Sequence, residues 1–308
     1  MDNKQVSKPK SKKELKKEKA QEPQTFGMVI YSWAKTILGA IIVVTILNGL
    51  ALASFVVPTG SMERTVMTGD FLFVNKFVYG PSTPQVIPFV NIPLPFYRFP
   101  GIKNPEKNDV IVFIFPGNRD EVEATEFQYY LKRCVATAGD TLEIKDKRVY
   151  INHAEFQLPV NGGFDPSMGE SPIDKMQTFP YGKGYTKDNY GPIRIPKKGD
   201  VVPLNMQNIN EWLIFIGREG HKVTSDGNNI YIDGKASTQY VVLRDYCFGM
   251  GDNRDHSLDS RYWGFIPYEN VVGTPIIVYW SWDTNSPFVK LFDKIASTRW
   301  SRIGKIIR

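Results

Sequence analysis

The longest apolar stretch of the chain lies near its N-terminus. Residues 36–57 form 22 consecutive uncharged positions, most of them apolar. As a helix, a stretch of this length measures about 33 Å and crosses the hydrocarbon core of a bilayer. Tyr31 and Trp33 precede it beside Lys35, a combination typical of a membrane interface. We predict a transmembrane helix over 36–57. We expect it to be retained, because the run is longer than the apolar region of a typical signal peptide.

After residue 58 the apolar runs become short and are separated by Pro, Gly, Asn and Asp. Their length and composition are those of β-strands, and the run 109–115 is continuous, as in a strand buried on both faces. This pattern predicts a mainly β fold. We expect a β core from residues 58–140 and 245–290, with residues 141–244 inserted as a second β-rich domain.

The two ends of the chain carry most of its positive charge. The formal net charge is +6, but residues 1–22 contribute +4, Lys35 adds one and residues 290–308 contribute +5, which leaves residues 36–289 at −4. A mildly acidic body with two basic ends is typical of contact with an anionic membrane and not of a nucleic-acid-binding protein. Because the lysines precede the apolar run, the positive-inside rule predicts a cytoplasmic N-terminus and a body on the outer side.

The two ends are also expected to differ in structure. Residues 1–35 are interpreted as a basic cytoplasmic tail, disordered over residues 1–25, which lack core-forming side chains. In residues 291–308, apolar positions recur at helical spacing among Lys and Arg. This predicts a basic amphipathic helix that lies against the outer leaflet or against the body. The Pro- and aromatic-rich stretch 86–102 is expected to be a loop, either packed on the body or in contact with lipid.

The sequence offers no pattern for a metal or cofactor site. Cys134 and Cys247 are the only cysteines, and both lie in apolar runs. They are expected to be buried free thiols and not a disulfide. The three histidines are scattered, and no Cys-x-x-Cys spacing occurs. We therefore expect no metal and no cofactor.

Ser61 follows the long apolar run within a few residues. Pro58 ends the regular structure before it, and Gly60 allows a sharp turn that leaves the serine uncrowded. A serine in a turn is more often structural than catalytic, because its hydroxyl bonds nearby backbone groups. A catalytic interpretation therefore needs a base from elsewhere in the chain.

Lys132 is the candidate base. Strand alternation places it on one face with Tyr130 and Cys134. Arg133 falls on the opposite face. A lysine among apolar neighbours loses hydration of its charged form, so its pKa falls and a neutral amine becomes available as a general base. The alternative is a solvent-exposed lysine on an edge strand.

The stretch from Gly251 to Gly264 is polar and dense in opposite charges, which core formation does not require. Its Asp, Asn and Ser side chains are suited to bonding local backbone and holding a rigid loop. Asp259 and Arg261 are two residues apart, so in an extended segment their side chains share one face and are placed to pair.

These three stretches together resemble the type I signal peptidases, the membrane-anchored Ser/Lys proteases that remove signal peptides from exported proteins. The matching segments are Thr59-Gly-Ser-Met62 with Gly69-Asp70 for the nucleophile box, Lys132-Arg133 with Gly139-Asp140 for the lysine box, and Gly251 to Gly264 for the last box. Their order, their spacing and the preceding apolar run also agree with that family.

The resemblance implies that Ser61 is the nucleophile and Lys132 the general base. It also implies an oxyanion hole formed by the Ser61 backbone N–H and the Thr59 hydroxyl. Two departures from the family's pattern lie close by. Thr59 stands where many members of the family have a serine, and it keeps a hydroxyl. The pair Glu63-Arg64 occupies the place of a proline that is usual in the family. Neither departure removes a catalytic group.

The resemblance further implies that Ser257 orients the Lys132 amine by a hydrogen bond and that Asp259 and Arg261 form a supporting ion pair. The family's substrates lie extended along a strand edge and carry small side chains at the first and third residues before the cut, the A-x-A pattern. The implied partners are secretory preproteins and membrane lipid. The implied location is the bacterial cytoplasmic membrane, with a single pass and the catalytic domain outside.

Two alternatives remain open. His256 and Asp259 lie in one short loop, so Ser61 could instead belong to a Ser/His/Asp triad. From a different class, the chain could be a membrane-tethered module that captures extended peptides without cutting them. The presence of every matched hydroxyl and of Lys132 argues against such a module, because an inactive descendant loses these groups without losing its fold.

Overall fold

The computed structural model describes residues 25–50, 52–81, 83, 97–164, 173, 176–284 and 291–308, and the chain separates into two compact units, residues 1–46 and 47–308. The predicted disorder of residues 1–24 and most of the predicted loop 86–102 lie outside the described residues. At the described end of that loop, Arg98 donates a hydrogen bond of 2.5 Å to the carbonyl of Tyr79. This end of the loop therefore packs on the body.

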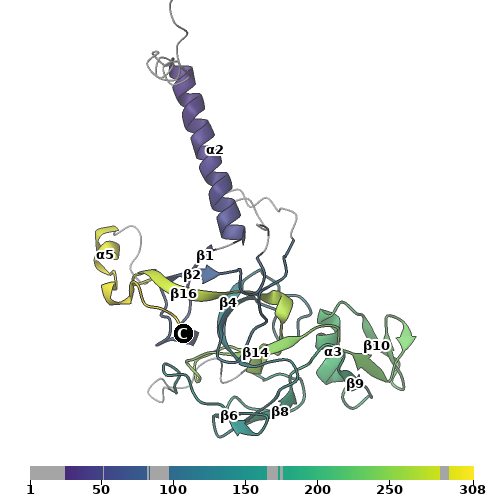
Figure 1. Cartoon of the computed structure of the whole chain (residues 1–308). Helices are drawn as coiled ribbons and strands as arrows, with labels where there is room; N and C mark the ends of the chain where they lie inside the picture. The colour runs from purple at the N-terminus through teal and green to yellow at the C-terminus, as the bar shows by residue number, and fades with distance from the viewer. Residues whose placement is uncertain are drawn as a thin grey trace, which may run out of the picture. The chain divides into compact units, whose positions relative to one another are not determined.

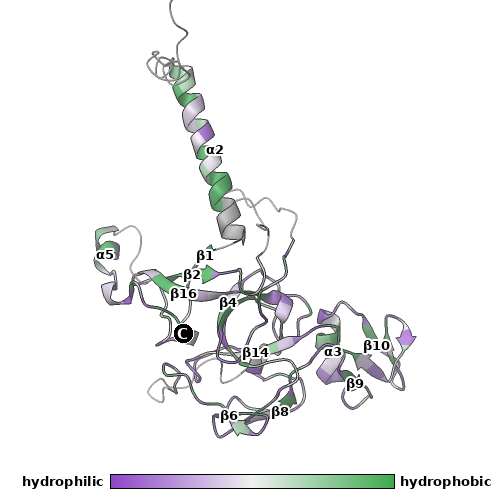
Figure 2. Ribbon diagram, in the orientation of Figure 1, coloured by the Kyte–Doolittle hydropathy of each residue, from purple (hydrophilic) through white to green (hydrophobic). Residues whose placement is uncertain are grey.

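The described part of the first unit is helical: it belongs to helix α2, Phe26–Leu50, whose last turn lies beyond the boundary at residue 46 (Figure 1). The helix begins at Phe26 and not at the predicted residue 36, because Lys35 is the only charge between these positions and the apolar pattern continues through them. Within α2, Phe26–Val44 is long and apolar enough to cross a membrane, and none of that segment is buried. Along its coloured ribbon, hydrophobic turns in green alternate with paler and purple ones (Figure 2).

The helix ends at Leu50, and strand β1, Leu52–Val56, follows where the helix was predicted to continue. This strand pairs antiparallel with β2, Asp70–Asn75, with Val56 opposite Phe71. The predicted helix boundary at residue 57 is therefore wrong. A short apolar run satisfies helix and strand alike, and the backbone groups offered by β2 decide the conformation here.

The second unit is organised around one antiparallel sheet of seven strands, in the order β1-β2-β16-β3-β4-β14-β15. The strands beside β1 and β2 are β3 (Val110–Ile114), β4 (Tyr129–Ala136), β14 (Tyr246–Met250), β15 (Ile266–Pro267) and β16 (Val271–Ser281). Figure 1 shows the late strands β14 and β16 among the early ones. The mainly β fold is confirmed, and the two predicted core segments do share one sheet.

Residues 141–244 form three smaller sheets, ordered β7-β6-β5-β8, β13-β9 and β10-β11-β12. Their bounds are β5 Thr141–Lys145, β6 Arg148–Ile151, β7 Ala154–Glu155, β8 Tyr190–Arg194, β9 Val201–Pro203, β10 Val223–Ser225, β11 Ile230–Ile232, β12 Lys235–Ala236 and β13 Gln239–Val241. The segment also contains helix α3, Ile209–Arg218, which the strand-like composition around it does not predict.

The inserted segment shares a hydrophobic core with the main sheet. Leu142 and Ile216 belong to the same buried cluster as Val135 of β4 and Phe248 of β14. A second cluster contains the two cysteines, which are free and buried as predicted. Strands β4 and β14 are therefore held by apolar packing on both sides, which fixes the position of the side chains that they carry.

The C-terminal residues form two short helical turns, α5 (Leu291–Ala296) and η4 (Trp300–Arg302), and the predicted long amphipathic helix is wrong. The chain then pairs with β16: the Gly304 N–H donates to the Val278 carbonyl at 2.8 Å and the Ile307 N–H to the Ile276 carbonyl at 3.0 Å. Ile307 is buried in the core. Backbone pairing and this burial outweigh helix formation, and the last residues contact the body.

Candidate active site

Ser61 lies in the short 3-10 helix η1, Gly60–Met62, directly after the first strand of the sheet. The turn is anchored before and after the serine. The Val57 N–H donates to the Asp70 carbonyl at 2.9 Å, and Met62 is buried with 1% exposure. Ser61 itself is half-buried. The turn therefore holds the hydroxyl of Ser61 at a fixed point while leaving one side of it accessible.

Lys132 lies on β4 and reaches the serine. Its Nζ donates a hydrogen bond of 2.6 Å to Ser61 Oγ, across 71 positions of sequence. The side chain is 4% exposed, and the Tyr130 and Trp263 ring centroids lie 5.7 and 5.9 Å from the amine. The alternative of an exposed edge-strand lysine is therefore wrong.

Burial controls the protonation of this amine. Desolvation lowers the pKa of Lys132 to about 8 and outweighs the opposing attraction of the buried Asp259 carboxylate. The Arg261 guanidinium lowers that pKa further. An ordinary lysine is almost wholly protonated near neutral pH, whereas Lys132 has a usable neutral fraction there. The pair can therefore transfer a proton from a hydroxyl to an amine.

The loop after β14 holds the backbone of the serine turn. Asn253 donates from its backbone N–H to the Ser61 carbonyl at 3.1 Å and from its side chain to the Gly60 carbonyl at 3.3 Å. The neighbouring Asp252 N–H lies 3.3 Å from the sulfur of Met62. These contacts fix the turn, although the residues are about 190 positions apart.

Asp259 and Arg261 form the predicted ion pair. Arg261 Nε and Nη2 reach the two carboxylate oxygens at 2.9 and 2.8 Å, and both side chains are buried. Asp259 also accepts a hydrogen bond of 3.1 Å from the Gly251 N–H. Burial raises the pKa of Asp259, but the Arg261 guanidinium outweighs it and holds that pKa below its usual range. The pair closes the loop that contacts Ser61.

Ser257 does not make its predicted hydrogen bond to Lys132. The Ser257 Oγ is buried and has no hydrogen-bond partner among the described residues. A Cβ at Gly251 would lie 2.2 Å from this oxygen and 2.4 Å from the Ser61 carbonyl oxygen. Ser257 therefore packs against the bare Gly251 backbone beside the catalytic turn. The position of Ser257 in the loop sequence therefore does not determine where its hydroxyl points.

Thr59 lies next to the serine, with 3.4 Å between Thr59 Oγ1 and Ser61 Oγ. Thr59 is exposed. Its hydroxyl is therefore on the accessible side of the turn, and its role as an oxyanion donor remains a prediction.

His256 is not joined to the candidate triad. Its buried Nε2 has no hydrogen-bond partner in the described part of the chain. Ser61 Oγ receives the bond from Lys132, and both oxygens of Asp259 are engaged by Arg261. The geometry therefore favours Lys132 over His256 as the partner of the serine.

A second buried ion pair supports the turn and is not evident from the sequence. Arg133 donates to both oxygens of Asp252 at 2.8 and 2.7 Å, and Thr65 donates to the same carboxylate at 2.5 Å. Arg133 and Asp252 are 2% and 0% exposed. Strand alternation correctly places Arg133 on the face of β4 opposite to Lys132. It does not identify the partner of Arg133, because Asp252 lies 119 positions away.

The cleft beside the serine has a volume of about 740 Å³. Residues from Phe55 to Glu63 form one wall, and residues from Gln128 to Lys132 on and before β4 form the other. Leu72 and Val112 add apolar surface. An extended chain laid between these walls would pass the Ser61 hydroxyl.

Residues 30–280 match the family model described as signal peptidase, peptidase S26. The chain is 30% identical over 266 residues to Signal peptidase I of Helicobacter pylori strain J99, a match that covers 82% of this chain and 83% of that protein. It is 30% identical over 237 residues to Signal peptidase I of Aquifex aeolicus, covering 74% and 75%. A solved signal peptidase I from Enterococcus faecalis is 21% identical and covers 56% of this chain and 98% of that chain at a TM-score of 0.25.

Proposed function

The chain belongs to the signal peptidase family, peptidase S26, and from that membership we propose that it is a membrane-anchored serine endopeptidase that removes N-terminal signal peptides from exported preproteins. The observation that carries the proposal is the hydrogen bond of 2.6 Å between Lys132 Nζ and Ser61 Oγ. A buried lysine with a lowered pKa has a neutral fraction that can take the serine proton.

In the proposed mechanism, Ser61 Oγ attacks the scissile carbonyl carbon while the neutral Lys132 amine takes the hydroxyl proton. The negative charge that forms on the carbonyl oxygen is stabilised by the Ser61 backbone N–H and the Thr59 hydroxyl. Collapse of this intermediate breaks the peptide bond, and the protonated Lys132 gives its proton to the leaving amine. A water molecule, deprotonated by Lys132, then hydrolyses the acyl-enzyme and restores Ser61.

Around this pair, Asp259 and Arg261 hold the loop that clamps the serine turn, and Ser257 fills the space between that loop and the Gly251 backbone. The Asp259 carboxylate also lies near enough to influence Lys132 electrostatically. We propose that these residues position the pair and do not exchange protons with the substrate.

The proposed specificity is for small side chains at the first and third residues before the cut. A substrate extended between the two walls of the cleft presents alternate side chains to the same apolar surface, formed in part by Phe55, Leu72 and Val112. Secretory preproteins with an A-x-A pattern satisfy this spacing.

The proposed location is the bacterial cytoplasmic membrane, with α2 as a single span, the N-terminus in the cytoplasm and the catalytic domain on the outer side. The apolar segment Phe26–Val44 and the lysines before it support this orientation. Exposed apolar side chains of the body, such as Phe73 and Trp300, are compatible with contact with lipid.

The test is cleavage of a purified preprotein by the detergent-solubilised protein, with the cut mapped by mass spectrometry. We expect a single cut after an A-x-A sequence. Ser61→Ala and Lys132→Ala should abolish it, and His256→Ala should leave it largely intact. An active Lys132→Ala with an inactive His256→Ala would reverse the assignment of the base, and an uncut preprotein would favour a peptide-binding module.

A further inference from the structure

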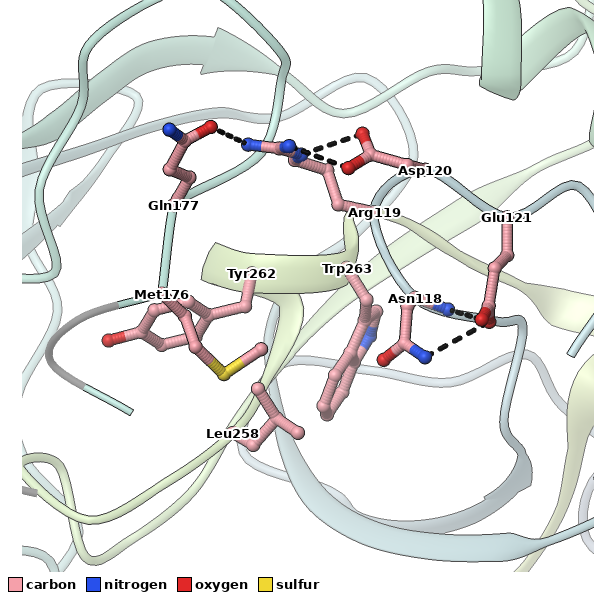
Figure 3. A pocket seen from close by; sticks show the side chains of 9 residues that line it. All are labelled: Asn118, Arg119, Asp120, Glu121, Met176, Gln177, Leu258, Tyr262 and Trp263. Atoms are coloured by element: carbon pink, nitrogen blue, oxygen red, sulfur yellow. Dashed lines mark hydrogen bonds and ion pairs between the residues drawn. The ribbon is translucent and has the colours of Figure 1, made fainter. Parts of the chain in front are cut away.

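A second pocket of about 360 Å³ lies beside the catalytic cleft (Figure 3). Its inner surface is apolar and comes from Met176, Leu258 and Trp263, whose side chains converge in the close view. Its rim is polar and includes Asn118, Arg119 and Gln177. The mechanism proposed above uses none of the rim residues.

The pocket adjoins the catalytic cleft. Leu258 lines both. Trp263 lines the pocket, and its ring centroid lies 5.9 Å from the Lys132 amine. Tyr130 lines the cleft and meets Trp263 edge-to-face at a centroid distance of 5.4 Å. One layer of side chains therefore separates the pocket from the catalytic amine.

The rim charges are compensated within the rim. Arg119 Nε and Nη2 pair with both oxygens of Asp120 at 2.8 and 2.6 Å, and Nη1 donates to Gln177 at 2.8 Å. Asn118 donates from its backbone and its side chain to Glu121 at 2.9 and 3.0 Å. These contacts are drawn in Figure 3. The pocket therefore offers an apolar interior under a rim whose ionic groups already have partners.

The pocket is also preformed. Arg218 of α3 donates to the Trp263 carbonyl at 2.9 Å and to the Gly117 carbonyl at 3.0 Å. One guanidinium thus ties the segment that carries Trp263 to the loop that carries Asn118. A preformed pocket loses little free energy to ordering when a side chain enters it.

We propose that this pocket binds a bulky apolar side chain of the preprotein from the first residues after the cut. The assignment rests on the proposed function. The signal-peptide side of the substrate occupies the part of the cleft between the Phe55–Thr59 wall and β4. The chain that follows the cut bond leaves past Lys132, where Leu258 leads into the pocket. Cleavage would thus depend on the mature sequence as well as on the A-x-A pattern.

The test compares substrates that share one A-x-A signal sequence and carry either Ala or Phe at the first, second or third residue after the cut. Met176→Trp narrows the pocket and leaves the cleft lining untouched. The matched control is Leu213→Trp, which adds the same side chain at an exposed position on α3. The measurement is kcat/KM for each substrate with each enzyme.

At one of the three positions, we expect the wild-type enzyme and Leu213→Trp to cut the Phe and Ala substrates at rates within a few-fold of each other. Met176→Trp should lower the Phe-to-Ala ratio of kcat/KM at that position about tenfold. Because the ratio is taken within one enzyme, partial loss of folded protein does not change it. An unchanged ratio at all three positions would overturn the assignment. If the wild-type enzyme cuts the Ala substrate, the proposed function stands in either case.

Discussion

Strand β4 carries one buried basic side chain on each face, and the surroundings of these two side chains differ. Lys132 and Arg133 are neighbours in sequence and are 4% and 2% exposed. Arg133 points to a carboxylate, Asp252, and binds it at both oxygens. Lys132 points to a hydroxyl and two aromatic rings. A buried cation with a bonded carboxylate is a structural element, whereas one without it has a lowered pKa and becomes available for proton transfer.

The largest expected effect on activity comes from replacing Lys132 by arginine, the residue type found on the opposite face of β4. Lys132→Arg keeps the charge but supplies a side chain that does not lose its proton at any working pH. We expect kcat/KM for preprotein cleavage to fall by about 10³-fold or more, with melting curves as the check on folding. Turnover by the folded Arg variant close to the wild-type value would exclude a neutral-lysine mechanism.

Removing the carboxylate that binds Arg133 on the opposite face of β4 should lower the free energy of unfolding. Asp252→Ala leaves the buried Arg133 without its carboxylate, which typically costs about 3–5 kcal/mol of unfolding free energy. The measurement is chemical denaturation of the purified protein. The double variant Asp252→Ala with Arg133→Met removes the unpaired charge and should recover a large part of the loss. If the double variant is no more stable than the single one, the ion pair does not explain the effect.

The next effect concerns the transition state at Ser61. Thr59→Val keeps the shape and the branching of the side chain but removes the hydroxyl, so kcat should fall about 10²-fold while KM changes little. Thr59→Ser keeps the donor and should retain most activity. The measurements are kcat, KM and melting curves for both variants. A loss of rate that only follows a loss of folded protein would make Thr59 a structural residue.

The pH dependence of cleavage should follow the protonation of the Lys132 amine. With a pKa lowered to about 8, Lys132 is progressively protonated below that pH, and kcat/KM should fall about tenfold per pH unit on the acid side. Between about pH 8 and the ordinary lysine pKa, the unfolded chain binds more protons at this residue than the folded one. Stability should therefore rise with pH through this window, and Lys132→Met should remove that part of the slope. A pH-independent rate between pH 6 and 9 would contradict the proposal.

The smallest effect tests the boundary between the two units. A protein lacking residues 1–50 keeps β1, whereas one lacking residues 1–57 loses this edge strand and the contact between Phe55 and Tyr129, whose ring centroids are 4.9 Å apart. Both proteins should fold, because the core lies beyond these residues except for Val57 and the partly buried Phe55. The shorter one should melt at a lower temperature in parallel scans. Equal melting temperatures would mean that β1 adds no stability.

The candidate site shows how far local patterns reach. Alternation along β4 correctly separated Lys132 from Arg133, and two-residue spacing correctly paired Asp259 with Arg261. Both inferences concern neighbours in sequence. Strand geometry determines the two directions on β4, whereas Asp259 and Arg261 pair at the start of helix α4, Ser260–Trp263, where Asp259 is the N-cap. The expected hydrogen bond between Ser257 and Lys132 depends on where the loop places the Ser257 hydroxyl relative to β4. This hydrogen bond is absent among the described residues.

The sequence by itself determined the mainly β class, the separation of Lys132 and Arg133 onto opposite faces of a strand and the residue types of the site, because these follow from composition, from period-two alternation and from the chemistry of the side chains. Only the tertiary structure decided that residues 52–56 are a strand, that the last residues pair with β16 and that Asp252 is the partner of Arg133. The physical reason is the same in each case. A backbone hydrogen bond or a buried charge has to be satisfied by whichever segment lies beside it, and in a sheet of this order that segment is often more than a hundred residues away.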